Sequence, residues 1–169
     1  MPFQPAQLPR YTVQILTTQF HLQGKMEPVG PILDYLNDAN RQFLSFLDTT
    51  ASLLTPGPMG QINRSQIVFP KSDIVAIFID DAKARSSLQL LKRVERAFIY
   101  LPSLVCRAEM HMGADSRWQD ALSLMPGDFF GVTDVAAFPL SPLPGPFPQQ
   151  TDVLILSRLH VKMIHLDQP

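Results

Sequence analysis

Two pairs of aspartates recur in this sequence at the same separation of 86 residues, Asp34 with Asp120 and Asp48 with Asp134. Paired carboxylates can act as general acid and base where a fold brings them together. A structural role explains them better, because Asp34 falls near the start of a predicted short helix, where a carboxylate interacts favourably with the helix dipole. Asp48 precedes two threonines late in a predicted strand and would fix a turn. We favour the structural role and predict no catalytic residue.

The four histidines lack the spacing of a metal site. His160 and His165 are five residues apart on a predicted strand, so they would point to opposite faces. Glu109 and His111 share a strand face with Asp115 nearby, and two of these side chains could hold a metal. A zinc site needs a closer set of three or four ligands. We therefore predict no metal and no cofactor, and interpret Glu109 and His111 as polar-face residues available to a ligand.

Several function classes are disfavoured by the sequence as a whole. It contains no nucleophile motif, phosphate-binding glycine loop or dinucleotide fingerprint. A net charge of -1 argues against nucleic-acid binding. No apolar run is long enough to span a membrane, and the single Cys106 excludes an intramolecular disulfide. We expect a cytoplasmic protein that is not an enzyme, binds no nucleic acid and does not span a membrane.

The 86-residue separation extends well beyond the aspartates. Eleven identities fall in one ungapped register, where unrelated sequences would share about three or four. We interpret this as a duplicated unit and predict four segments. These are a flexible N-terminal segment (1–10), repeat 1 (11–81), a connector helix (82–96) and repeat 2 (97–169).

Each copy is predicted to hold about four strands and one short helix. Residues 20–26 and 106–112 alternate between apolar and polar, the period of a strand with one buried face. A helical turn and a second strand rich in aromatic and β-branched residues follow in both copies. In the connector, Ala84, Leu88 and Leu91 form one apolar helical stripe. The predicted fold class is mainly β with minor α: two pseudo-symmetric small β-barrel or sandwich-like repeats joined by one helix.

The last strands of the two copies differ. Residues 74–79, IVAIFI, are apolar on both faces and must be covered on both, whereas residues 160–165, HVKMIH, can face water on one side. We expect the first to be central or at an interface and the second to be more exposed. Ile74, Ala76 and Phe78 are therefore candidate interface residues.

One block of the chain resembles a family of short, uncharacterised bacterial domains. The residues that carry the resemblance are a helix turn (Leu33, Asp34, Tyr35, Leu36, Asn37) and a strand (Phe43, Leu44, Leu47, Asp48). The second copy keeps Asp120, Leu122, Phe129, Thr133 and Asp134 but lacks the Tyr and Asn. The resemblance implies no known activity. At fold level alone, the strand order is similar to small five-stranded barrels of the Sm type.

The predicted function is that of a non-enzymatic interaction or scaffold protein, assembling with itself or within a larger complex. A charged fraction of only 17%, a strand apolar on both faces and proline-rich loops favour this function. The alternative is a small-ligand-binding module that uses the cleft between the repeats. Its contacts would be Asp34, Tyr35 or the face formed by Glu109 and His111.

Overall fold

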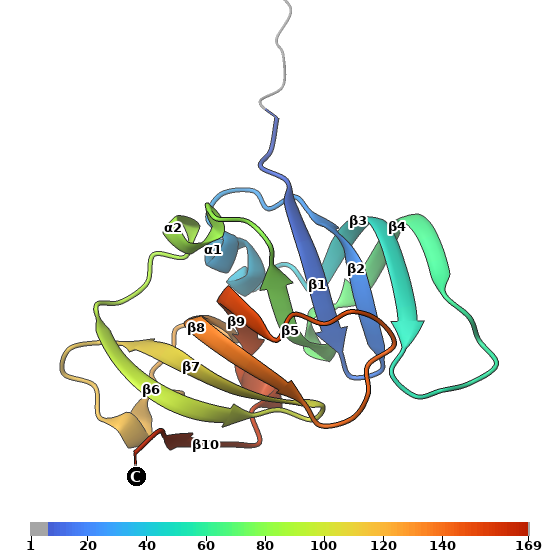
Figure 1. Cartoon of the computed structure of the whole chain (residues 1–169). Coiled ribbons are helices and arrows are strands. Elements are labelled where there is room, and N and C mark those ends of the chain that lie inside the picture. The colour runs from blue at the N-terminus through green and yellow to red at the C-terminus, as the bar shows by residue number, and fades with distance from the viewer. Residues whose placement is uncertain (1–6, 169) are drawn as a thin grey trace, which may run out of the picture.

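The protein is mainly β with minor α, as predicted, in a computed structural model that describes residues 7–168 (Figure 1). Most of the predicted flexible segment, residues 1–6, lies outside this range. Within it, the strands are β1 (Tyr11–Thr17), β2 (Phe20–Met26), β3 (Phe43–Leu53), β4 (Ile62–Pro70), β5 (Ile74–Ile79), β6 (Arg93–Tyr100), β7 (Leu104–Met112), β8 (Phe129–Pro139), β9 (Gln150–Ser157) and β10 (Met163–Leu166). The helical segments are α1 (Ile32–Asn37), α2 (Ala84–Ser87), η1 (Lys71–Asp73), η2 (Trp118–Asp120) and η3 (Arg158–His160).

All ten strands belong to one antiparallel sheet in the order β10-β6-β7-β8-β9-β5-β1-β2-β3-β4. The first five strands lie in the order β5-β1-β2-β3-β4, and the last five in the order β10-β6-β7-β8-β9. The two runs join where β5 pairs with β9. The sheet is therefore open, with β4 and β10 as its outer strands.

Side-chain alternation places the cores. In β7 every second residue from Leu104 to Met112 is buried, as the period of two predicts. The buried side chains form two apolar clusters, one mainly from β1–β5 with α1 and the other mainly from β6–β9. Each run of strands thus has its own core.

The strand β5 belongs to both cores, and its position confirms that residues 74–79 are central. All six residues are buried, with Ile77 in the first cluster and Ala76 and Phe78 in the second. Side chains of the two clusters cover its two faces and β9 pairs beside it, so Ile74, Ala76 and Phe78 are buried within the chain. β10 is an edge strand of alternating exposure, as expected for the more polar sequence.

The helix predicted for residues 82–96 is wrong over most of its length. Only α2 is helical, and Gln89, with φ of 50°, follows it in the left-handed conformation that ends helices. Leu91 of the predicted stripe is exposed, while Ala84 and Leu88 are buried. From Arg93 the chain is a strand, because pairing with β7 and β10 satisfies its backbone on both sides.

Asp48 and Asp134 occupy the same unusual conformation. Their φ angles are 47° and 49°, and each lies opposite a break in the register of its strand with the preceding one, β2 with β3 and β7 with β8. Aspartate is among the few side chains that tolerate this region, because its carboxylate can bond locally. Asp48 therefore lies in a β-bulge within the long strand β3, and not in the turn that the sequence predicts.

Candidate functional site

A polar cavity lies where the two strand runs meet. It has a volume of about 580 Å³ and is lined by residues 79–82 at the end of β5, 134–136 of β8 and 150–152 of β9, with Arg96 and Arg107 from β6 and β7. Its walls are polar and carry both signs of charge, since four aspartates face the two arginines. The arrangement suits a small polar or zwitterionic ligand better than an apolar one.

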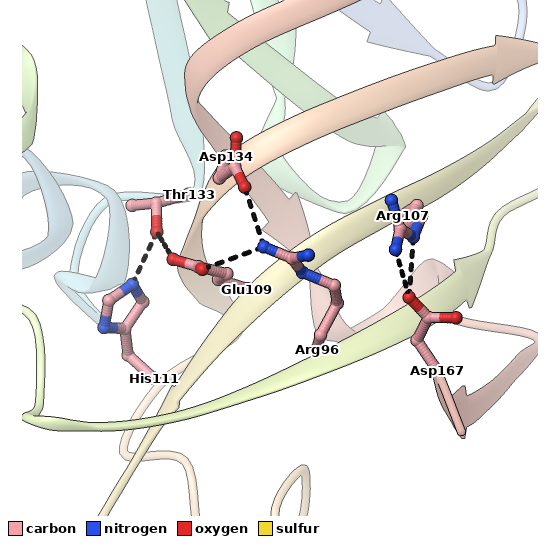
Figure 2. A network of polar contacts seen from close by, with 7 residues as sticks. All are labelled: Arg96, Arg107, Glu109, His111, Thr133, Asp134 and Asp167. Carbon is pink, nitrogen blue, oxygen red and sulfur yellow. Dashed lines mark hydrogen bonds and ion pairs between the residues drawn. The ribbon is translucent and has the colours of Figure 1, made fainter. Parts of the chain in front are cut away.

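The guanidinium of Arg96 bridges two carboxylates beside this cavity (Figure 2). Its Nη2 lies 3.0 Å from Asp134 Oδ2 and 3.3 Å from Glu109 Oε1. Three adjacent strands position these groups, β6 for Arg96, β7 for Glu109 and β8 for Asp134. Asp134 has a left-handed backbone conformation and directs its carboxylate toward Arg96. The bulge therefore positions the carboxylate for this ion pair.

His111 is connected to this network through the hydroxyl of Thr133. Its Nε2 lies 2.8 Å from Thr133 Oγ1, and its Nδ1 donates to the Leu91 carbonyl oxygen at 2.9 Å. The Thr133 hydroxyl in turn donates to Glu109 at 3.4 Å. When that hydroxyl points to Glu109, both ring nitrogens of His111 must act as donors. Thr133 is fully buried, so its hydroxyl is closed to a substrate from outside.

Arg107 is the second arginine that lines the cavity, and its side chain is paired with a residue near the C-terminus. Its side chain makes an ion pair of 2.6 Å with Asp167, just after β10 (Figure 2). Both arginines therefore carry carboxylate partners already. An anionic ligand would have to displace or share them.

The structure brings together two of the predicted site residues and separates the others. Glu109 and His111 share the Thr133 network, yet neither lines the cavity. Tyr35 is buried in the first core, with Arg41 4.3 Å above its ring. Ile74, Ala76 and Phe78 are buried in β5. The residues that sequence reasoning missed are Arg96, Arg107, Asp80 and Asp152, because only the β5–β9 junction makes them neighbours.

The repeated aspartates do not meet in one site. Asp48 pairs with Lys25 at 2.9 Å, whereas Asp134 pairs with Arg96. The bond from Lys25 is the main cause that holds the pKa of Asp48 below its ordinary value. Both contacts are ion pairs, and neither is the turn-fixing contact that the sequence predicts for Asp48.

The histidines near the C-terminus are also separated. His160 lies in η3 rather than on a strand, a correction to the prediction, and its Nε2 donates to the Ser72 carbonyl oxygen at 2.6 Å. His165 lies on β10 near Phe98 and Tyr100. Across residues 7–168, no three His, Cys, Asp or Glu side chains cluster closely enough to hold a metal ion.

Both outer strands of the sheet present apolar side chains to solvent. Val68 on β4 and Met163 on β10 are 55% and 51% exposed, and Phe43 on the neighbouring β3 is 58% exposed. The strand β4 has nine residues, of which only Arg64 is charged. Unpaired edges of this kind are templates for pairing with another chain unless charge, proline or a cover blocks them.

Comparisons with protein-family models, with curated proteins and with solved structures give no match to this chain. Among the described residues, no helix has both the length and the apolar character needed to cross a membrane. The arrangement of the site itself must therefore carry any functional conclusion.

Proposed function

We propose that this protein is a non-enzymatic interaction or scaffold protein that assembles with itself or within a larger complex. The observation that carries the proposal is the pair of unpaired edge strands, β4 and β10, with exposed Val68 and Met163. Edge pairing supplies main-chain hydrogen bonds, and exposed apolar side chains supply burial. We further propose that the two strand runs are copies of one duplicated unit, each a small barrel-like or sandwich-like repeat.

The remaining parts of the proposal follow from charge and thiol chemistry. A net charge of -1 favours a protein partner over nucleic acid. Cys106 is unpaired and buried, and burial raises its pKa to about 12, so it fits a reducing compartment such as the cytoplasm as a packed core residue.

Size-exclusion chromatography with light scattering tests this function. We expect the purified protein at micromolar concentration to run above the 18.9 kDa of one chain, or to retain a partner when isolated from its native source. A clean monomer that retains no partner would contradict the proposal.

The cavity supports a second candidate, a module that binds a small polar ligand between the two strand runs. Its walls combine Asp80 from the first run with Arg96 and Asp152 from the second. A thermal-shift screen of small zwitterions tests this candidate. We expect a stabilising compound to lose its effect in Asp152→Asn and to keep it in Asp34→Asn, a matched change outside the cavity lining. A screen without a hit, or a hit that both variants retain, would contradict it.

A further inference from the structure

We propose that the β10 edge of one chain pairs with the β4 edge of a second copy, in the arrangement that β5 and β9 adopt inside each chain. This inference rests on the proposed self-assembly and names its surfaces, its register and its partner.

The internal junction is itself an edge-to-edge contact. β5 and β9 are the outer strands of their own runs, and they pair antiparallel with Ala76 opposite Leu156, Ile77 opposite Ile155, and Phe78 opposite Leu154. All of these side chains are buried. The chain thus already shows how one run joins another.

The β4 edge is the counterpart of β9. Phe43 lies opposite Pro70 and Phe129 lies opposite Ser157, so a shift of 86 residues in β3 (129 less 43) accompanies one of 87 in β4 (157 less 70). Applied to the junction, this shift matches Leu154, Ile155 and Leu156 to Ile67, Val68 and Phe69.

The β10 edge is the counterpart of β5. The hairpins β1–β2 and β6–β7 place Leu16 opposite His21 and Tyr100 opposite Val105, a shift of 84 for both members (100 less 16, 105 less 21). On their other sides, Leu16 faces Ala76 and Tyr100 faces Met163, a shift of 87 (163 less 76). Met163, Ile164 and His165 therefore match Ala76, Ile77 and Phe78.

These matches fix the register of the proposed contact between chains. Met163 would face Phe69, Ile164 would face Val68, and His165 would face Ile67. Exposure agrees with this register. Val68 and Met163 are 55% and 51% exposed, whereas their counterparts Ile155 and Ala76 are fully buried at the internal junction. The outer edges carry apolar surface at the positions that the junction covers.

The internal junction includes a second contact, between α1 and β8, and its counterpart beside β4 has no covering segment within the described residues. Inside the chain, α1 lies against β8, where Asn37 Nδ2 donates to the Phe129 carbonyl oxygen and Phe129 N–H donates to Asn37 Oδ1, each at 2.9 Å. Phe129 is 3% exposed, whereas its counterpart Phe43 is 58% exposed. The counterpart of α1 is the segment 118–122, so that segment of the chain that contributes β10 would cover Phe43 of the chain that contributes β4.

The contact is heterologous, because it joins two different surfaces. Each added chain leaves one free β4 and one free β10, so further chains can add. The rotation between neighbouring chains decides whether the assembly closes into a ring or extends as a filament. A symmetric dimer through two β4 edges or two β10 edges is the competing arrangement.

Mixing two edge variants separates these arrangements. Val68→Asp blocks β4 and Met163→Asp blocks β10, because each would bury an unpaired charge. We expect either variant alone to run at the 18.9 kDa of one chain, with self-association weakened about hundredfold or more. An equal mixture should run at twice that mass, since the intact β10 of the first variant pairs with the intact β4 of the second.

Leu140→Asp is the matched control, because Leu140 is an exposed leucine outside both edges, and it should assemble like the parent protein. Far-ultraviolet circular dichroism identifies any variant that fails to fold. For such a variant, disulfide trapping tests the register with smaller changes. Chains carrying Val68→Cys and Ile164→Cys should form a mixed dimer, while Ser65→Cys with Ile164→Cys should not. Cys106 is buried and leaves this background clear.

The outcomes distinguish this inference from the broader function. If the parent assembles but both charge variants assemble equally well, the edge contact is wrong and self-assembly stands. If only one variant dissociates and the mixture shows no heterodimer, a symmetric edge contact replaces the proposed one. A parent protein that is a monomer and retains no partner overturns both proposals.

Discussion

Gly127 lies so close to Asn37 that a Cβ atom on residue 127 would overlap the Asn37 side-chain amide. The two residues are far apart in sequence and come from different strand runs. Gly127 precedes β8, and Asn37 is the last residue of α1. The missing side chain lets α1 approach β8 closely enough for Asn37 to bond both backbone polar groups of Phe129.

Removing the Asn37 amide should weaken the contact between the two strand runs. Asn37→Ala leaves the N–H and C=O of Phe129 without partners, and we expect a loss of about 1–3 kcal/mol in the free energy of unfolding. Asn37→Asp should cost more than Asn37→Ala, because a carboxylate oxygen would then face the Phe129 carbonyl. Urea denaturation measures both losses. Asn40→Ala, an exposed asparagine with no side-chain hydrogen bond among the described contacts, should change stability by less than about 0.5 kcal/mol.

Gly127→Ala should be destabilising, and only while Asn37 is present. We expect about 1–3 kcal/mol from the steric overlap. In a double-mutant cycle the loss from Gly127→Ala should shrink in the Asn37→Ala background, since the overlapping amide is gone. Gly60→Ala is the control, because a Cβ there meets no atom within 4 Å. Strict additivity of the two changes would show that Gly127 acts through something other than Asn37.

The left-handed backbone conformation of Asp134 leads to a third prediction. A β-branched side chain is strained in this conformation, so Asp134→Val should destabilise by about 1–3 kcal/mol. Asp134→Asn tolerates the conformation and loses only an exposed ion pair with Arg96, a loss of about 0–1 kcal/mol. Thermal unfolding of both variants tests the order. Equal losses would place the effect in the ion pair rather than in the backbone.

Asp48 should contribute to the acid limb of the stability profile. Its folded-state pKa lies below the ordinary value of 3.8, first because of the hydrogen bond from Lys25. A depressed folded pKa means that the contribution is present above pH 3.8 and is lost as the pH falls through the folded value. Stability measured from pH 6 downward should therefore fall less steeply in Asp48→Asn than in the parent protein. An unchanged acid slope would contradict the assignment.

The sequence predicts the elements of this fold better than their partners. Alternation locates β2 and β7, and the apolar helical turns locate α1 and η2. Those features are local, because each is written in neighbouring side chains. The helix at 82–96 is the main failure, since an apolar stripe of three residues also fits a turn followed by a strand. Residues 93–100 form a strand because they pair with β7 and β10.

The candidate site was harder to foresee for the same reason. Glu109 and His111 could be identified as sharing a face, because they alternate on one strand. Arg96 and Asp134 could not be connected to them, since the ion pairs cross three strands and depend on the bulge at Asp134. The cavity walls come from both runs and exist only at the β5–β9 junction.

By itself the sequence determined that residues 74–79 must be covered on both faces and that the last strand could face water. Side-chain polarity dictates both, whatever the fold. Only the tertiary structure decided that the cover includes the second run of the same chain, that β4 and β10 are left unpaired, and that Val68 and Met163 are exposed there. Strand pairing joins residues distant in sequence through backbone hydrogen bonds, which all residues except proline can form, so no side-chain pattern specifies the partner in advance.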